Sequence, residues 1–451
     1  MRRRAFVAGL PLAGCAGVWR RAAPATEERP AVVAPVFAEL EKIGGARMVR
    51  SVMPGSPVVH FGVSLAVGCV ADPPARPGLT ALVLAAVVDR GLRDGLARLG
   101  ATPRITWTAD GGTLACACES GDVAAIVEML ARRLRAPVLD AAGLSAAVAR
   151  AEAAAAIAAG DPRRVAMRAL DGLIFGEDGA RAHRGVAARG GLVGLTAEEL
   201  AAHADKFVGP TRMMWISTGE ADLRPAIAAA WAGWAPDTSR NFEFALEVTR
   251  RTSIVLVDRP GADQVVIATG RRGLPATDAD CVLAARAMRI LRSAVHERLR
   301  GDRGLSYYTE AGHDDGHPGR LRLVTQVDAD AAGEALRVVL WGLEHVQELV
   351  VAQKWMDDQD TYDALEQVYV QDSGEGRIAA ASRSHRLELP LNAPPARARP
   401  VGRLMRVIDE LLRPANWQVV CVGDQRKVLA QLERFGAVAV REVSSRQAHP
   451  R

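Results

Sequence analysis

The sequence has few aromatic residues and only a small excess of positive charge. Phe, Trp and Tyr together make up 4% of the 451 residues, and the formal net charge at pH 7 is +5. The basic residues are nearly all Arg, and they are scattered among Ala, Gly and acidic residues. Nucleic-acid-binding domains gather positive charge on one face or carry a recognisable motif. We therefore interpret the charge as a compositional bias and expect no nucleic-acid partner.

Cysteine is also scarce. Apart from Cys15, near the N-terminus, the chain contains Cys69, Cys116, Cys118, Cys281 and Cys421. An odd number without a C-x-x-C pair, and without His at ligand spacing, argues against a structural zinc site and a dense disulfide framework. A single disulfide is still compatible with this set. Cys116 and Cys118 would share one face of a strand, so we expect them to be small core residues.

Beyond the N-terminus the sequence lacks a long apolar run. The stretch 79–88 is too short to span a bilayer, and the Ala-rich stretch 151–159 is accompanied by Arg150 and Glu152. The chain exceeds the usual size of a single core, so two or more domains with ample buried surface are expected.

The N-terminus itself predicts export. Arg2-Arg3-Arg4 precede a short apolar run, which ends in Leu12-Ala13-Gly14-Cys15. A basic start followed by a brief apolar region and small residues is typical of a signal peptide. The last four residues resemble a bacterial lipobox, so we expect lipidation of Cys15, and Ala16 favours the outer membrane. Arg3-Arg4-Ala5-Phe6-Val7 also resembles a twin-arginine signal. Cleavage elsewhere, with loss of Cys15, stays an alternative.

The rest of the chain repeats one plan. Three landmarks recur at a separation of 204 to 206 residues: Pro54-Gly55-Ser56 with Pro260-Gly261-Ala262, Gly100 with Gly304, and Thr218-Gly219-Glu220 with Val422-Gly423-Asp424. Each pair follows and precedes elements of the same kind. Such internal similarity indicates two structurally similar halves.

Apolar periodicity predicts the same element order in each half: two strands, a helix, two strands, several helices, and a final strand and helix. In the first half we expect strands at 58–67, 113–118 and 213–217, and helices at 78–98, 123–134 and 140–159. Thr196-Ala197-Glu198-Glu199 forms a capping box that opens one more helix. In the second half we expect strands at 265–269 and 321–327, and helices at 277–299 and 333–346. The predicted fold class is α+β, with a mixed, mostly antiparallel sheet covered by helices in each half.

These patterns divide the chain into six segments. They are an export signal with lipobox (1–14), a tether (15–44), a first domain (45–235), a linker (236–251), a second domain (252–445) and a tail (446–451). The Pro- and Arg-rich stretch 391–403 is expected to be a surface loop.

Several segments resemble the peptidase M16 (insulinase/pitrilysin-like) family in its short, two-chain bacterial form. They are Leu96-Ala97-Arg98-Leu99-Gly100-Ala101, Trp231-Ala232-Gly233-Trp234 and Leu299-Arg300-Gly301-Asp302-Arg303-Gly304-Leu305-Ser306-Tyr307. The last is the most specific, because it matches each fixed position of the L-R-x-x-x-G-L-x-Y stretch of family members. The resemblance covers roughly residues 45 to 443. It implies a clam-like chamber between the two halves.

The resemblance fails at the metal site. Active members carry H-x-x-E-H on the first long helix, where two His one turn apart bind zinc and Glu serves as general base. The matching positions here are Ala81, Leu84 and Ala85, which can neither bind zinc nor move a proton. The third ligand would fall near Ala154, and the nearby Glu152 would have no partner ligands. We therefore expect no metal and no cofactor in this chain, which would lack catalytic residues of its own.

The second half carries two residues to which the resemblance assigns a role in the active site. By resemblance, Arg300 and Tyr307 would bind the substrate backbone or a developing oxyanion, and Arg and Tyr donors suit a carbonyl or carboxylate. A different candidate is the stretch His313-Asp314-Asp315-Gly316-His317, whose two His and two Asp could bind a metal. Its Gly and Pro neighbours favour a solvated hairpin turn instead.

These observations leave three functional hypotheses. In the first, the chain is a non-catalytic subunit that binds peptide and completes the active site of an H-x-x-E-H-bearing M16-like partner in a heterodimer. In the second, it is a scaffolding lipoprotein with no peptidase role. In the third, it is a hydrolase that uses His313 and His317. The expected location is the periplasmic side of the cell envelope, with a lipid anchor in the outer membrane.

Overall fold

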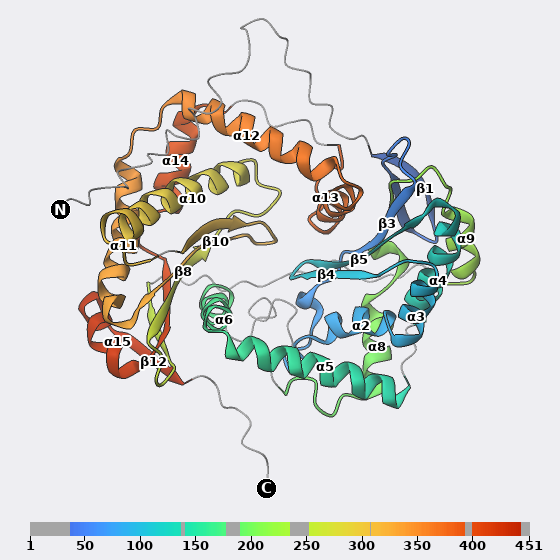
Figure 1. Ribbon diagram of the computed structural model, residues 1–451, viewed down its shortest axis with the longest axis horizontal. Helices are drawn as coiled ribbons and strands as arrows, with labels where there is room; N and C mark the ends of the chain where they lie inside the picture. The colour runs from blue at the N-terminus through green and yellow to red at the C-terminus, as the bar shows by residue number, and fades with distance from the viewer. Residues whose placement is uncertain are drawn as a thin grey trace, which may run out of the picture. The chain divides into compact units, whose positions relative to one another are not determined.

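The computed structural model describes residues 37–136, 140–176, 190–234, 252–306, 308–392 and 399–442. Within these ranges the chain forms two six-stranded mixed sheets and thirteen α-helices (Figure 1). The predicted α+β class with two similar halves is therefore confirmed. The export signal, Cys15, the linker 236–251 and the tail 446–451 lie outside the described residues.

The first sheet has the strand order β1-β2-β6-β3-β5-β4. Its strands are β1 (Ala38–Ile43), β2 (Ala46–Arg50), β3 (Val58–Leu65), β4 (Arg104–Thr108), β5 (Gly111–Glu119) and β6 (Met213–Ser217). Strands β2 and β6 run parallel, whereas the other neighbours are antiparallel. Successive side chains of a strand point to opposite faces, so β3 presents Val59, Phe61 and Val63 to one core and His60, Gly62 and Ser64 to the opposite face.

The second sheet has the order β12-β7-β11-β8-β10-β9. Its strands are β7 (Ile254–Asp258), β8 (Gln264–Arg272), β9 (Thr309–Asp314), β10 (Arg320–Asp328), β11 (Gln418–Gly423) and β12 (Val438–Glu442). Five strands correspond one to one with the first sheet. The sixth differs, because β1 forms an antiparallel pair with β2, whereas β12 comes from the other end of its half and runs parallel to β7.

The three landmark pairs have matching conformations. Gly55 and Gly261 have φ of 74° and 81°, and Gly100 and Gly304 have φ of 65° and 64°. This left-handed region favours glycine, because a side chain there is strained. The third pair has another reason, since a Cβ on Gly219 or Gly423 would contact the side chain of Val59 or Val265, respectively. The repeat seen in the sequence therefore reflects the same backbone geometry in both halves.

The helices of the first half are α2 (Leu79–Val87), α3 (Arg90–Arg98), α4 (Val123–Arg135), α5 (Ala141–Gly160), α6 (Pro162–Phe175), α8 (Ala197–Phe207) and α9 (Arg224–Ala230). The single helix predicted over 78–98 is wrong, because the chain breaks at Asp89. This residue has an extended backbone, and its carboxylate accepts the N–H of Leu92 at 2.7 Å, so it caps α3. The predicted capping box of Thr196 and Glu199 is confirmed.

The helices of the second half are α10 (Cys281–His296), α11 (Ala332–Glu348), α12 (Gln353–Gln371), α13 (Gly374–Arg386), α14 (Val401–Leu411) and α15 (Gln425–Leu432). A short π-helical segment, Glu297–Asp302, extends α10. The predicted helix 277–299 begins later than expected, because Asp278 forms a turn and accepts the N–H groups of Asp280 and Cys281.

Each half contributes one helix to the sheet of the other half. Helix α6 packs on β8 and β11 of the second sheet, and α13 packs on β3 and β6 of the first (Figure 1). The opposite face of each sheet is covered by helices of its own half, in two large apolar cores. Both faces of each sheet are thus buried, and the two exchanged helices join the halves.

Helix α5 differs from expectation in one respect. By length and composition alone it is apolar enough to cross a membrane, although the sequence contains Arg150 and Glu152 within it. It packs against α2 and α6 in the folded chain. The five cysteines of the described residues are thiols, and Cys116 and Cys118 are core residues as predicted.

Candidate functional site

The helix that would carry the metal motif is α2, and its motif positions are apolar. Leu84 is buried at 1% exposure in the core of the first half. Ala81 and Ala85 are half-buried and lie one turn apart, the spacing that two ligands would need. Within the described ranges, no three His, Cys, Asp or Glu side chains come together as metal ligands. The helix keeps its place in the fold while its side chains offer no metal chemistry.

The helix that would supply the third ligand is α5, and it packs against α2. Ala154 is exposed on α5. The carboxylate of Glu152 accepts the backbone N–H of Gly190 at 2.6 Å and that of Leu192 at 3.3 Å. Glu152 therefore has a structural task, since it holds the chain that leads into α8. The two helices pack together, but Ala81, Ala85 and Ala154 stand at the positions where metal ligands would be needed.

A buried polar network that the sequence did not reveal lies at the start of α2. The carboxylate of Asp72 accepts the backbone N–H groups of Gly78 and Thr80, both at 2.7 Å, and the Thr80 hydroxyl. Thr80 Oγ1 also lies 2.8 Å from Nε2 of His203 on α8. Burial raises the pKa of Asp72 and lowers the pKa of His203 to about 4. This network anchors the N-terminus of α2, where a carboxylate satisfies free N–H groups.

In the second half, the stretch 299–307 follows α10. Three of its positions have structural reasons. Leu299 is buried in the core of the second half, and Leu305 packs against that core. The N–H of Leu305 donates to the carbonyl of Leu299 at 2.7 Å, and Gly304 has a φ of 64°. Leucine and glycine at these positions follow from packing and backbone geometry.

Arg300 belongs to the same stretch. Its side chain is exposed on the π-helical segment. Tyr307 lies outside the described residues. Its neighbour Ser306 is buried, with its hydroxyl 3.0 Å from Thr325 Oγ1 and donating to the carbonyl of Tyr308 at 2.7 Å. These hydrogen bonds tie the chain just before β9 to the neighbouring strand β10.

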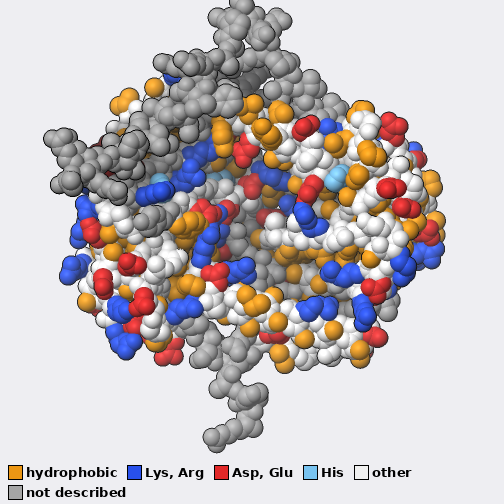
Figure 2. Space-filling view, viewed as in Figure 1, with side chains coloured by type: hydrophobic (Ala, Val, Ile, Leu, Met, Phe, Trp, Pro, Cys, Tyr) orange, Lys and Arg blue, Asp and Glu red, His pale blue; other side chains and the backbone are white. Residues whose placement is uncertain are grey.

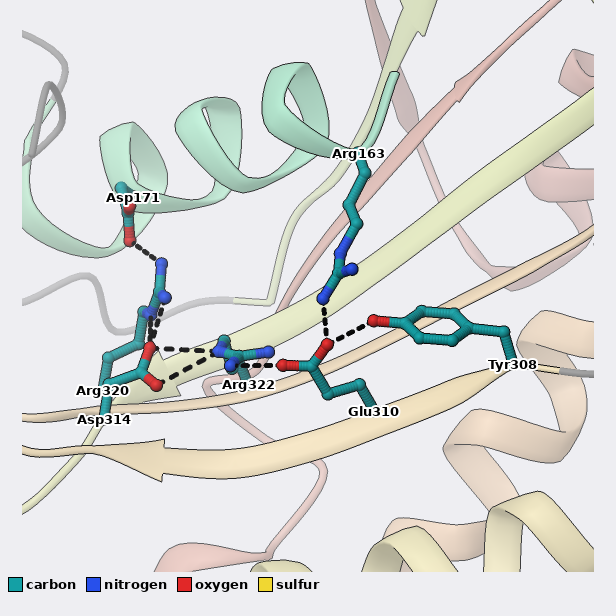
Figure 3. A network of polar contacts seen from close by, with 7 residues as sticks. All are labelled: Arg163, Asp171, Tyr308, Glu310, Asp314, Arg320 and Arg322. Atoms are coloured by element: carbon teal, nitrogen blue, oxygen red, sulfur yellow. Dashed lines mark hydrogen bonds and ion pairs between the residues drawn. The ribbon is translucent and has the colours of Figure 1, made fainter. Parts of the chain in front are cut away.

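A chain of alternating charges lies beside this strand (Figure 3). Asp171 of α6 pairs with Arg320 of β10, which also pairs with Asp314 of β9. Arg322 pairs with Asp314 and with Glu310. The network ends at Arg163 of α6, which pairs with Glu310 and lies over the ring of Tyr308, 4.8 Å from its centre. Helix α6 comes from the first half, so the network links the two halves at β9.

Burial changes along this network. The side chains of Arg320 and Asp171 are 4% and 2% exposed, whereas Arg163 is 43% exposed. Burial, followed by the hydrogen bond to Glu310, raises the pKa of Tyr308 to about 12. Burial alone would raise the pKa of Glu310, but the bonds from Tyr308 and Arg322 outweigh it and lower that pKa. Glu310 is therefore ionised at neutral pH, with Tyr308 as its neutral donor.

The His313 and His317 hypothesis receives no geometric support. His313 and Asp314 belong to strand β9, so the expected solvated loop is wrong for these two residues. The His313 ring lies 3.0 Å from the carbonyl of Leu274 and 3.5 Å from Sγ of Cys281. The His317 ring lies 3.0 Å from the carbonyl of Leu387. The two rings bind separate backbone carbonyls and do not converge on one ion.

Comparisons with known proteins agree on the fold. No protein-family model and no curated protein matches the sequence. Among solved structures, a peptidase M16 inactive domain from Pseudomonas fluorescens superposes with a TM-score of 0.76 and 16% sequence identity, over 86% of this chain and 98% of that chain. A protease from Helicobacter pylori superposes with a TM-score of 0.74 and 10% identity, over 87% of this chain and 100% of that chain.

The periplasmic protease PqqL from Escherichia coli is also similar, with a TM-score of 0.70 and 12% identity. The match covers 88% of this chain but 47% of PqqL, so this chain spans about half the length of that protease. At such low identities the similarity establishes the fold, which is that of M16-like peptidases.

Proposed function

From this M16-like fold we propose that the protein is a non-catalytic subunit of a two-chain metallopeptidase. Its partner is an M16-like chain that carries the H-x-x-E-H motif and the zinc. This chain contributes a peptide-binding surface and completes the partner's active site. The proposal accounts for a fold that spans about half the length of one similar protease, PqqL.

One contrast carries the proposal. The metal helix α2 keeps its packing against α5 but has Ala81, Leu84 and Ala85 at the ligand positions. In the motif of the second half, Leu299, Gly304 and Leu305 serve packing and backbone geometry, and Arg300 is exposed on the π-helical segment beside them. The chain thus lacks the groups that would hold a metal, while it carries an Arg that can donate hydrogen bonds to a peptide carbonyl.

The chemistry assigned to the second half is donation of hydrogen bonds. Arg300 offers planar paired donors and Tyr307 one hydroxyl, and both suit a peptide carbonyl or the oxyanion that forms during hydrolysis. The metal and general base come from the partner, where three protein ligands hold zinc and a Glu moves the proton. The substrate is a peptide, bound in extended form between the subunits.

The proposed location is the periplasmic side of the cell envelope. Support comes from the basic start, the apolar run and the lipobox that ends at Cys15. PqqL, which has a similar fold, is a periplasmic protease. A lipid on Cys15 anchors the chain in the outer membrane, so Cys15→Ser should abolish labelling with fatty acid. A wild-type protein without lipid would contradict the anchor and leave the peptidase role untouched.

The test of function uses the chain co-expressed with an H-x-x-E-H protein of similar length encoded beside it. Arg300→Ala, and separately Tyr307→Phe, should lower peptide cleavage by the mixed complex by about 10²- to 10³-fold, the usual loss of one oxyanion donor. The melting temperature and the assembly of the complex should hardly change, since exposed substitutions shift stability by about 0.5 kcal/mol or less. A matched control is Arg298→Ala on the same segment, with cleavage unchanged.

Unchanged cleavage in both variants would contradict the proposal. The scaffolding role would then be the better hypothesis, and the same outcome would follow if no H-x-x-E-H chain binds. Purified protein should contain less than about a tenth of an equivalent of zinc, because a competent site needs three or four ligands.

A further inference from the structure

Helix α12 carries large apolar side chains that are exposed. Tyr362, Leu365, Val368, Tyr369 and Val370 are 56%, 52%, 37%, 82% and 46% exposed. We call these five residues the α12 stripe. The other exposed large apolar side chains of the described residues are scattered singly over other elements. Single exposed apolar residues are normal on a soluble protein, whereas a cluster indicates an interaction surface.

The exposure of this part of α12 extends around the whole helix. All six residues from Leu365 to Val370 are exposed. Consecutive residues of a helix are 100° apart, so six of them pass more than once around the axis. The N-terminal part of α12 is anchored, because Met356 is buried and Asp360 and Asp363 pair with Arg286. A solvent-exposed helical turn is normally polar all round, yet four of these six residues are apolar.

Helix α5 provides a matched comparison within the chain. Each of the two helices precedes an exchanged helix, α6 or α13. The exposed face of α5 is mostly Ala, which combines the best helix propensity with little apolar area. The α12 stripe contains Val and Tyr, which are poorer helix formers. Neither core packing nor helix propensity explains the α12 stripe. On the face of the molecule drawn in Figure 2, hydrophobic side chains lie over the part where α12 runs.

The charge beside the stripe indicates what kind of partner it fits. Glu366 and Asp372 are exposed next to it, and no basic residue occurs in the sequence between Lys354 and Arg377. Arg289 of α10 lies over the Tyr362 ring, but its charge is paired with Asp363. A second copy that packed α12 against α12 would bring two acidic borders together, which is unfavourable. The complementary surface is an apolar helix face bordered by Arg or Lys.

We infer that the α12 stripe is the surface on which the zinc-bearing M16-like subunit docks, through an apolar helix face with a basic border. This inference rests on the proposed function for the identity of the partner. It places the contact on a helix that joins the two halves, outside the residues assigned to peptide binding. Large exposed aromatic side chains in such a position are typical of residues that dominate binding free energy.

The experiment measures the dissociation constant between the purified chain and the H-x-x-E-H chain encoded beside it. Leu365→Gln combined with Tyr369→Gln should raise the Kd by about 30-fold or more, as expected when interface hot spots are removed. Ile157→Gln is the matched control, because Ile157 is 71% exposed on α5; its Kd should stay within about two-fold of wild type. Glu366→Lys with Asp372→Lys should weaken binding most at low salt.

Hydrogen exchange provides a readout that needs no variant. Amides of 362–370 should gain protection in the wild-type complex and not in the chain alone. A wild-type complex whose Kd is unchanged by the α12 substitutions would overturn the docking surface and leave the proposed function standing. A wild-type chain that forms no complex with the zinc-bearing chain would overturn both. Self-association that the α12 substitutions abolish would overturn the choice of partner and assign the stripe to a second copy.

Discussion

The two exchanged helices occupy equivalent places and are held by different forces. Helix α6 buries Ala166, Leu170, Ile174 and Phe175 against valine and alanine side chains of four strands of the second sheet. Helix α13 contributes only Ile378 and Ala381 to an apolar cluster on the first sheet. Its other contacts are polar: Arg377 donates to the carbonyls of Ser51 and Val52, and Arg386 donates to Thr113.

The buried polar groups differ in the same way. On the α6 side, Asp171 and Arg320 form a buried ion pair that continues into the network of Figure 3. On the α13 side, Nδ1 of His385 lies 3.1 Å from Oγ of Ser64, and both residues are buried and neutral. Burial, followed by the nearby charges of Arg47 and Arg386, lowers the pKa of His385 to about 3. Helix α6 is thus held mainly by apolar area and a buried ion pair, and α13 mainly by hydrogen bonds.

The largest expected effect tests the ionic part of this comparison. Asp171→Ala leaves the buried guanidinium of Arg320 without one of its carboxylates, so the free energy of unfolding should fall by about 3–5 kcal/mol. The matched variant is Glu375→Ala, which removes the exposed ion pair of α13 with Arg104, where the side chains are 56% and 67% exposed. It should cost about 1 kcal/mol or less. Urea unfolding would show whether the two costs differ; equal costs would contradict the comparison.

The next effect tests the apolar part. Leu170→Ala should lower the free energy of unfolding by an amount in the upper part of the range of about 2–5 kcal/mol that is usual for such truncations. Ile378→Ala should fall in the lower part, because fewer apolar side chains surround it. The two sites share no partner in the apolar clusters, so the double variant should be additive within about 0.5 kcal/mol. A larger cost for Ile378→Ala would reverse our assignment of the stronger interface.

The smallest effect concerns pH. The folded pKa of His385 is about 3, below the ordinary value of 6.5, so the unfolded chain binds more protons between these values. The stability contributed by neutral His385 is complete above pH 6.5 and is lost as the pH falls towards 3. The loss is at most about 1.4 kcal/mol per pH unit. Between pH 6.5 and 5 this slope should come from the buried histidines, whose folded pKa values are lowered.

The measurement is urea unfolding at several pH values for wild type and His385→Gln. The variant should be less stable at pH 7, because Ser64 loses its partner, and its stability should fall less steeply on acidification. His203, whose pKa is about 4, should retain its own part of the slope in both proteins. Parallel pH profiles would show that folding does not lower the pKa of His385, which would contradict the neutral pair.

Much of the secondary structure could be predicted from sequence patterns. The strand 213–217 and the capping box at Thr196 agree with the structure, and the landmark glycines mark matching left-handed turns. The break at Asp89 was missed because the stretch before it is apolar on all sides, so its periodicity does not change where the helix ends. The network of Asp72, Thr80 and His203 was missed because His203 is 123 residues from Thr80 in the chain.

The candidate site was predictable only in part. The loss of ligands at Ala81, Leu84 and Ala85 could be recognised from the sequence, because residue type alone decides whether a side chain can bind zinc. The structure added the reasons for Leu299, Gly304 and Leu305, which follow from packing and backbone geometry. The charged network at β9 could not be predicted, since two of its members come from α6 of the other half.

By itself, the sequence determined the repeat, the α+β class and the absence of metal ligands on α2, because these depend on local periodicity and residue chemistry. Only the tertiary structure decided which sheet each of α6 and α13 covers. Periodicity shows that a helix has a buried face, and it carries no information about which of two similar sheets will bury it. That choice depends on complementary side chains far apart in the chain, such as Leu170 beside Gly270 and Ile378 beside Gly62.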